Sequence, residues 1–198
     1  MVKRLIGTGT TGSDGSCVIP YEGTGAGVVN LSVETEIDGS IVSETLNVLD
    51  CIFKDMGTSS DYGTWTSTDF TDSKISRNNE YTTLIPQDNY ESQTKSSLPD
   101  TSLVIEFDMC LTYTTATGAD FLRLIGSNTM SYNPTELGIV SGQWHHVKFT
   151  RDGINMIPNV DGTNKQTKAV NSFSTFKIVL NNTLCTDLKY KNFKVYPI

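Results

Sequence analysis

The chain has 198 residues, a net charge of −7 and a charged fraction of 19%. Thr (27) and Ser (19) together make up close to a quarter of it, whereas Ala occurs four times. Ala is the best helix former and Thr suits strands, so a mainly helical protein is disfavoured. No apolar run approaches the ~20 residues that span a bilayer, and no basic cluster is available to neutralise phosphates. We therefore expect neither membrane insertion nor a nucleic-acid partner.

Residues 1–50 are predicted to form short strands joined by Gly-rich turns. Residues 17–21 read as one strand, and residues 28–36 alternate apolar and polar side chains, which is typical of a half-buried strand. Asp38-Gly39 is a hairpin turn signal, and residues 41–49 supply the partner strand.

Residues 51–198 are predicted to form a second, larger all-β domain. Residues 52–79 are polar and aromatic, which favours long loops between short strands. Tight turns are expected at residues 151–153 and at Asp161-Gly162. Short strands about ten residues apart, with no helical apolar stripe, indicate a sandwich or jelly roll. The predicted strands are 102–111, 121–125, 144–150, 154–160, 163–170, 176–180 and 189–197.

The four cysteines show no metal-binding spacing. Cys17, Cys51, Cys110 and Cys185 form no CxxC or CxxH motif, so a Cys-based zinc site is not expected. Their even number would allow two disulfides, but a chain of this size builds a core without them, and buried thiols are common. Free thiols are the favoured interpretation, and the disulfide alternative stays open.

The N-terminal segment resembles a known repeat. The stretches 7–15 (GTGTTGSDG), 19–27 (IPYEGTGAG) and 42–50 are similar to the C-terminal half of a bacterial Ig-like repeat. Only three or four of the roughly seven strands of that fold would be present. A half sandwich exposes an apolar face. The resemblance therefore implies that residues 1–50 pack on the second domain, pair with another chain in a homo-oligomer such as a trimer, or are completed by the rest of a longer chain.

The second domain resembles the laminin-G/concanavalin A-like jelly roll. Its motifs are Gly142-Gln-Trp-His-His-Val147, the hairpin Val160-Asp-Gly162 and Asn192-Phe-Lys-Val-Tyr196. The fold class implied is all-β, with this jelly roll at 51–198 preceded by a partial Ig-like segment at 1–50. The join is most similar to adhesin-like proteins of methanogenic archaea and their tailed viruses, which implies a location outside the cell, at its surface or on a virion. By analogy with the family, Trp144 is expected in the core.

Glu106 and Asp108 test for glycosidase chemistry. Laminarinase-type enzymes of this fold carry E-x-D-x-x-E on one strand, and retaining hydrolysis needs two carboxyls about 5–5.5 Å apart. Here Leu111 stands where the second Glu would be. We therefore interpret Glu106 and Asp108 as the solvent-facing side of a half-buried strand and expect no catalytic residue.

His145 and His146 are adjacent and are the two histidines of the chain. On a strand they point to opposite faces and cannot chelate one metal together. We expect one to pack against a loop and the other to face solvent. No Gly-x-Ser-x-Gly elbow accompanies them, so a catalytic triad is poorly supported.

Loop carboxylates leave room for a structural Ca²⁺, a hard cation that takes oxygen ligands. None of them forms the EF-hand pattern, so no ligand set is assigned and no other cofactor is expected. The loop candidates are Asp55, Asp61, Asp69, Asp72 and Asp187.

Aromatic residues in polar, loop-like contexts favour sugar binding, because sugar rings stack on aromatic faces. Arg123 is a lone cation in an apolar strand that must face a groove or pair with a carboxylate, with Glu106 and Asp108 as candidates. Tyr81 and Tyr90 share the loop-like context. The predicted ligand-binding residues are Tyr62, Trp65, Tyr113, Arg123 and Tyr132.

The sequence predicts a non-enzymatic adhesin or receptor-binding module for a cell-surface glycan or envelope polymer, for example at the tip of a viral tail fibre. Single-site affinity would be weak and multivalent display would supply strength. Two alternatives remain open: a glycan hydrolase or lyase with an atypical acid pair, and a purely structural fibre domain.

Overall fold

The computed structural model describes the backbone of residues 28–37, 40–49, 51–115 and 121–198, and the side chains of residues 51–71, 73–115 and 121–198. The predicted strand at 17–21, Cys17 and the Gly-rich motifs at 7–15 and 19–27 lie outside the described residues. No helix in the described part is long and apolar enough to span a bilayer.

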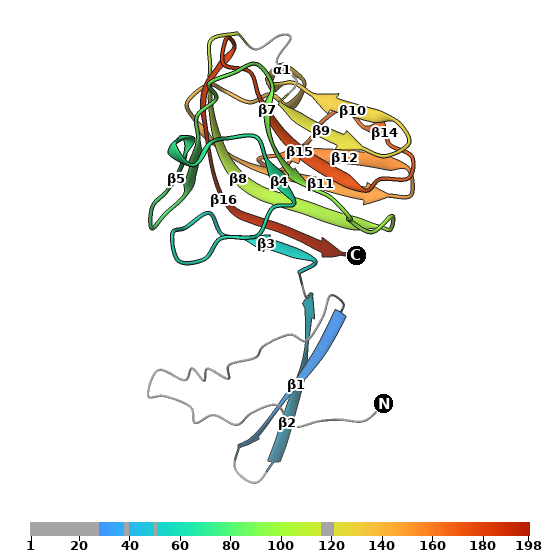
Figure 1. Ribbon diagram of the computed structural model, residues 1–198. Helices are drawn as coiled ribbons and strands as arrows, with labels where there is room; N and C mark the ends of the chain where they lie inside the picture. The colour runs from blue at the N-terminus through green and yellow to red at the C-terminus, as the bar shows by residue number, and fades with distance from the viewer. Residues whose placement is uncertain (1–27, 38–39, 50, 116–120) are drawn as a thin grey trace.

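The predicted N-terminal hairpin is confirmed. Strand β1 (Val28–Ile37) pairs antiparallel with β2 (Ser40–Leu49), from Val28 opposite Leu49 to Ile37 opposite Ser40. The two strands form a sheet of their own (Figure 1). The Asp38-Gly39 turn signal itself lies outside the described residues. The assignment of the segment to an Ig-like repeat stays a prediction.

The larger part of the chain is an antiparallel two-sheet sandwich of the jelly-roll type, as predicted (Figure 1). Its first sheet has five strands, in the order β10 (Thr129–Tyr132), β9 (Leu122–Ile125), β15 (Thr175–Leu180), β7 (Glu91–Lys95) and β4 (Ser67–Thr68).

The second sheet has nine strands. Seven follow the order β13 (Thr163–Asn164), β12 (Asn155–Val160), β11 (Trp144–Asp152), β8 (Leu103–Tyr113), β16 (Cys185–Pro197), β6 (Thr82–Leu84) and β5 (Ile75–Arg77). Strand β14 (Lys168–Ala169) pairs with β12, and β3 (Phe53–Asp55) pairs with β16. Helical structure in the described part is limited to η1 (Asp72–Lys74) and α1 (Pro134–Leu137).

Two details of the strand prediction can be checked closely. The hairpin at Asp161-Gly162 is confirmed: both residues have positive φ, 51° and 81°, and Val160 pairs with Thr163. The continuous strand predicted at 163–170 is wrong. Only β13 and β14 pair with β12, at opposite ends of it, because the chain leaves the ladder between them.

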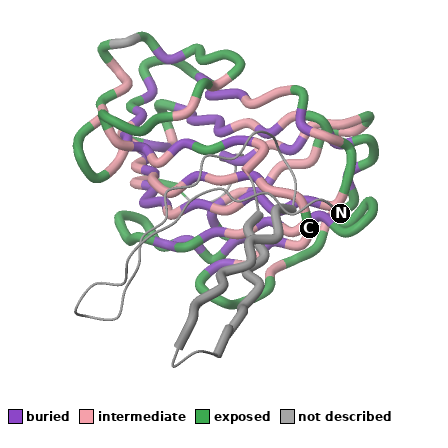
Figure 2. The backbone as a smooth tube through the Cα atoms, turned by 90° about the horizontal axis from the view of Figure 1, so that it is seen from below, coloured by how far each residue is buried: buried purple, intermediate pink, exposed green. Residues whose placement is uncertain are grey.

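The core lies between the two sheets and is built from alternating inward side chains. Phe107 of β8 stacks on Phe193 of β16 with ring centroids 4.9 Å apart, and Phe176 of β15 meets Phe193 from the opposite sheet at 5.4 Å. Such aromatic pairs add ~0.5–1.5 kcal/mol each beyond area burial. Buried residues follow the strands, and exposed residues gather in the connecting loops (Figure 2).

Cys110 and Cys185 are buried free thiols, which agrees with the favoured interpretation for these two cysteines. Burial raises the pKa of both thiols because the thiolate loses its hydration. Cys185 belongs to the hydrophobic core, whereas Cys110 lies on the outer side of β8, opposite Trp144.

Candidate functional site

The outer face of the nine-stranded sheet carries a row of polar and aromatic side chains. On β11, Val147 and Phe149 are fully buried, so the alternation turns Trp144, His146 and Lys148 to the outside. On β8, Glu106 and Asp108 share that face, with Asp108 opposite His146 and Glu106 opposite Lys148. The predicted solvent-facing alternation of Glu106 and Asp108 is confirmed.

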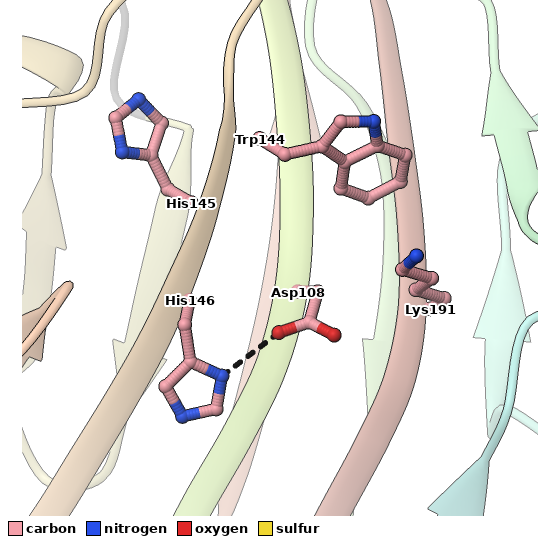
Figure 3. A pocket seen from close by; sticks show the side chains of 5 residues that line it. All are labelled: Asp108, Trp144, His145, His146 and Lys191. Carbon is pink, nitrogen blue, oxygen red and sulfur yellow. Dashed lines mark hydrogen bonds and ion pairs between the residues drawn. The ribbon is translucent and has the colours of Figure 1, made fainter.

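A shallow pocket of about 200 Å³ opens at this face. Figure 3 shows the indole of Trp144 reaching across β8 toward Lys191 on β16, with the Asp108 carboxylate below it. Rigid strands, rather than loops, carry the side chains that border the pocket, so their positions are fixed by the sheet. The lining residues are Asp108, Trp144, His145, His146 and Lys191.

Asp108 is the polar centre of the pocket. One carboxylate oxygen contacts His146 Nδ1 at 2.8 Å, and the other accepts a hydrogen bond from Asn192 Nδ2 at 2.6 Å. Asn192 lies in a β-bulge between Lys191 and Lys194, and its φ of 56° is in the left-handed region that Asn tolerates better than most residues. The bulge brings the amide to Asp108 and so fixes the carboxylate from both sides.

Trp144 is the aromatic element of the pocket, and the expectation that it belongs to the core is wrong. Its side chain keeps 42% of its surface exposed, because the inward positions of β11 are occupied by its neighbours in the alternation. The Tyr81 ring lies 5.7 Å from the indole in a tilted arrangement. The Lys191 ammonium lies 4.8 Å from the indole centroid, and that of Lys189 lies 5.9 Å from the Tyr81 centroid.

His145 points to the other side of β11, as predicted, and is 7% exposed (Figure 3). Its Nε2 accepts a hydrogen bond from the Val140 amide at 3.0 Å, so Nδ1 carries the ring proton and donates to Asp161 at 2.6 Å. This hydrogen bond lowers the pKa of Asp161, and the amide of His146 adds to the effect at 2.8 Å. His145 therefore ties the start of β11 to the Asp161-Gly162 hairpin.

Glu106 is engaged by a tyrosine instead of a second acid. The Tyr196 hydroxyl donates to Glu106 Oε2 at 2.8 Å. Burial raises the pKa of Tyr196, and the neighbouring Glu106 carboxylate raises it further. Leu111, in place of the second glutamate of the glycosidase motif, is fully buried in the core. The motif is therefore interrupted in space as well as in sequence.

Two of the predicted ligand-binding aromatics make contacts with the core. Trp65 packs edge-on against Phe53 and Phe193, with centroids 5.2 and 5.0 Å away, and its Nε1 donates to Asp55. Tyr132 is fully buried and its hydroxyl donates to the Met156 carbonyl. Tyr132 is the last residue of β10, and its ring lies 5.4 Å from that of Phe149 on the opposite sheet.

The structure does not gather the remaining predicted residues at one site. Tyr113 lies on β8, and its hydroxyl donates to the Ile139 carbonyl at 2.7 Å. Tyr62 is exposed, and the Arg77 guanidinium lies 4.6 Å above its ring.

Arg123 lies on β9 of the five-stranded sheet, 5.7 Å from the ring of Tyr90. The ion pair suggested between Arg123 and Glu106 or Asp108 is wrong, because both carboxylates belong to the opposite sheet.

No three His, Cys, Asp or Glu side chains converge to hold a metal ion in the part of the chain whose side chains are described. Asp55, one of the calcium candidates, is fully buried, and protein donors occupy both of its oxygens. Asp61 pairs with Lys54, and Asp69 accepts a hydrogen bond from Ser92. A structural Ca²⁺ thus has no assembled ligand set among these residues.

The comparisons with known proteins identify the fold. No model of a known protein family matches the chain, and no curated protein is significantly similar in sequence. Among solved structures, a sialidase aligns over 85% of this chain with 11% identity and a TM-score of 0.50, and the chain spans only 21% of that protein. Carbohydrate binding module CBM66 from Bacillus subtilis aligns over 66% of this chain and 91% of its own, with 11% identity and a TM-score of 0.42. Alginate lyase AlgAT5 aligns over 74% of this chain and 94% of its own, with 11% identity and a TM-score of 0.46.

Proposed function

We propose that the chain is a non-enzymatic glycan-binding module and that the pocket around Trp144 is its binding site. The observation that carries the proposal is a half-exposed indole on a rigid sheet, directly beside a preorganised set of polar groups. A concave site that combines an aromatic side chain with a few convergent polar groups is the usual make-up of a small-molecule binding site. The jelly-roll fold, shared with a carbohydrate binding module, is consistent with this use.

The pocket offers both contacts that a sugar needs. The exposed part of the Trp144 indole provides an apolar surface for the C–H face of a pyranose ring. Asp108 still has acceptor capacity, and His146 and Asn192 border it with N–H groups. Because Asp108 is held from two sides before any ligand arrives, little conformational entropy is lost on binding.

Three features support binding over hydrolysis. Leu111 replaces the second acid of the glycosidase motif, Glu106 is hydrogen-bonded by Tyr196, and the pocket is open to solvent. A shallow site on one sheet face gives weak single-site affinity, so strength would come from several copies displayed together. We infer a role in attachment at a cell surface or on a virion, where such repeated display is available.

The test is a glycan array probed with the full chain and with Trp144→Ala. We expect Trp144→Ala to lose at least about tenfold in affinity for every bound glycan, which corresponds to ~1.4 kcal/mol. Tyr62→Ala is the matched control: Tyr62 is an exposed aromatic away from the pocket lining and should leave binding unchanged. Binding that survives Trp144→Ala, or that Tyr62→Ala removes equally, would refute this site.

A second measurement addresses catalysis. Each glycan that binds is incubated with the protein, and new reducing ends and unsaturated products are quantified. Binding without product is the expected result. If product forms and Asp108→Asn abolishes it, the chain is a hydrolase or lyase, and the proposal of a non-enzymatic binding module is refuted.

A further inference from the structure

A row of lysines occupies the same sheet face as the pocket. Although the chain carries a net charge of −7, Lys189, Lys191 and Lys194 follow one another along β16, and Lys148 lies on β11 opposite Glu106. The bulge at Asn192 keeps the row on one face: Lys191 pairs with Asp108 and Lys194 with Glu106, although the lysines are three positions apart in the sequence and the acids only two. Alternation alone would have turned Lys194 inward.

These four lysines are free of close ion pairs with the side chains that the structure describes. Among the side chains that the structure describes, none of them forms an ion pair within 4.0 Å, whereas Lys54 pairs with Asp61 and Lys168 with Glu136, each at 2.8 Å. Three carboxylates share the face and keep their negative charge, but each is hydrogen-bonded to a group other than a lysine. Tyr196 donates to Glu106, His146 and Asn192 hold Asp108, and Thr112 donates to Asp187.

The position of two of these lysines links the row to the pocket. The Lys191 ammonium lies 4.8 Å from the Trp144 ring centroid, and the Lys189 ammonium lies 5.9 Å from the ring of Tyr81. A sugar ring stacked on the exposed indole would place its ring substituents beside these ammonium groups. Because both ammonium groups lie against the aromatic rings, a ligand that reaches the indole meets positive charge there.

We infer that the ligand of the Trp144 pocket is an anionic polysaccharide, one that carries a carboxylate or sulfate group on its sugar residues. This inference rests on the proposed function and specifies its ligand class. A lysine ammonium is a point charge without the planar fork of arginine, so the row selects negative charge but does not discriminate a carboxylate from a sulfate. Three lysines in succession along β16 fit a polymer with a repeated charge better than a single charged sugar.

The experiment compares three polymers by titration with the full chain: polygalacturonate, dextran sulfate and neutral dextran. We expect one or both anionic polymers to bind and dextran not to bind. Affinity should fall with added salt, because salt screens exposed charges and the screening length is only about 10 Å at 0.1 M ionic strength. The double variant Lys189→Gln/Lys191→Gln should weaken anionic binding at least tenfold. The matched control is Lys177→Gln on β15 of the opposite sheet, which should not change it.

The outcomes separate this inference from the proposed function. Dextran binding that equals anionic binding and depends on Trp144 would overturn the charge inference and leave the glycan-binding proposal standing. Loss of affinity of equal size in the control and in the double variant would also overturn it, as would failure of both anionic polymers to bind. Absence of any glycan that depends on Trp144 would remove the proposed function itself.

Discussion

Removing the Asp55 carboxylate should destabilise the sandwich strongly. Asp55 lies on β3, is fully buried, and accepts three hydrogen bonds: from Trp65 Nε1 at 2.6 Å, from the Tyr190 hydroxyl at 2.9 Å and from the Gly57 amide at 2.8 Å. Burial raises the pKa of Tyr190, and the adjacent Asp55 carboxylate raises it further. This acid therefore connects three parts of the chain: the segment at Trp65, the residues that follow β3 at Gly57, and Tyr190 of β16.

The magnitude follows from the donors that Asp55→Ala would leave unpaired. Each buried unsatisfied donor costs ~1–3 kcal/mol; two of the three donors are buried and the Trp65 indole is partly buried, so the three together set an upper limit of about 9 kcal/mol. Removing the carboxylate also removes its own desolvation penalty, which offsets part of that cost. We expect a net loss of about 3–5 kcal/mol in the free energy of unfolding, a large fraction of the ~5–15 kcal/mol typical of a domain.

Urea unfolding followed by circular dichroism and by tryptophan fluorescence would measure this loss. Asp61→Ala is the control, because Asp61 is an exposed acid whose ion pair with Lys54 is worth only ~0–1 kcal/mol. Asp55→Asn keeps one acceptor oxygen and should fall between the two variants. An Asp55→Ala protein as stable as the Asp61→Ala protein would show that the three hydrogen bonds are not what holds this corner together.

Three further perturbations have defined outcomes. A Cβ at Gly126 would clash with the Asn171 carbonyl oxygen, so Gly126→Ala should lower the thermal midpoint, and an unchanged midpoint in calorimetry would contradict the packing described. The hydrogen bond from His145 lowers the pKa of Asp161, so its stabilisation is full above the ordinary Asp value of 3.8 and is lost as pH falls through the lowered folded value. Asp161→Asn should therefore lower stability at pH 6 and converge with the wild type in strong acid, and a constant difference across pH would refute this reading. Cys185 should resist iodoacetamide in the native protein and react after unfolding, since burial raises its thiol pKa, and rapid native labelling by peptide mapping would count against it.

The strands were predictable because their pattern is local. Val147 and Phe149 alternate with polar residues on β11, and Asp161-Gly162 supplies the two positive φ angles of the hairpin. The same alternation places Trp144 outside, so the signal for the main aromatic of the site was present in the sequence. The analogy with the family nevertheless led to the wrong prediction that Trp144 lies in the core.

The composition of the site was not predictable in the same way. Asp108 and His146 become neighbours through the pairing of β8 with β11, which are separated by three other elements in the chain. Trp65 and Tyr132 stand in polar stretches, yet both rings turn inward because the chain around them packs onto the sandwich. Polarity of the surrounding sequence reports loop location but not the direction of a ring.

The β-bulge at Asn192 adds one residue to β16 that the packing of the core does not require. Tyr190, Phe193 and Val195 point into the core, and Lys191 and Lys194 point away. Deleting Asn192 would therefore leave a regular alternation of inward and outward side chains on β16. Tyr190, Phe193 and Val195 would still point into the core. What would disappear is the amide that secures Asp108. The outer face can therefore change at this position without a change in the hydrophobic core.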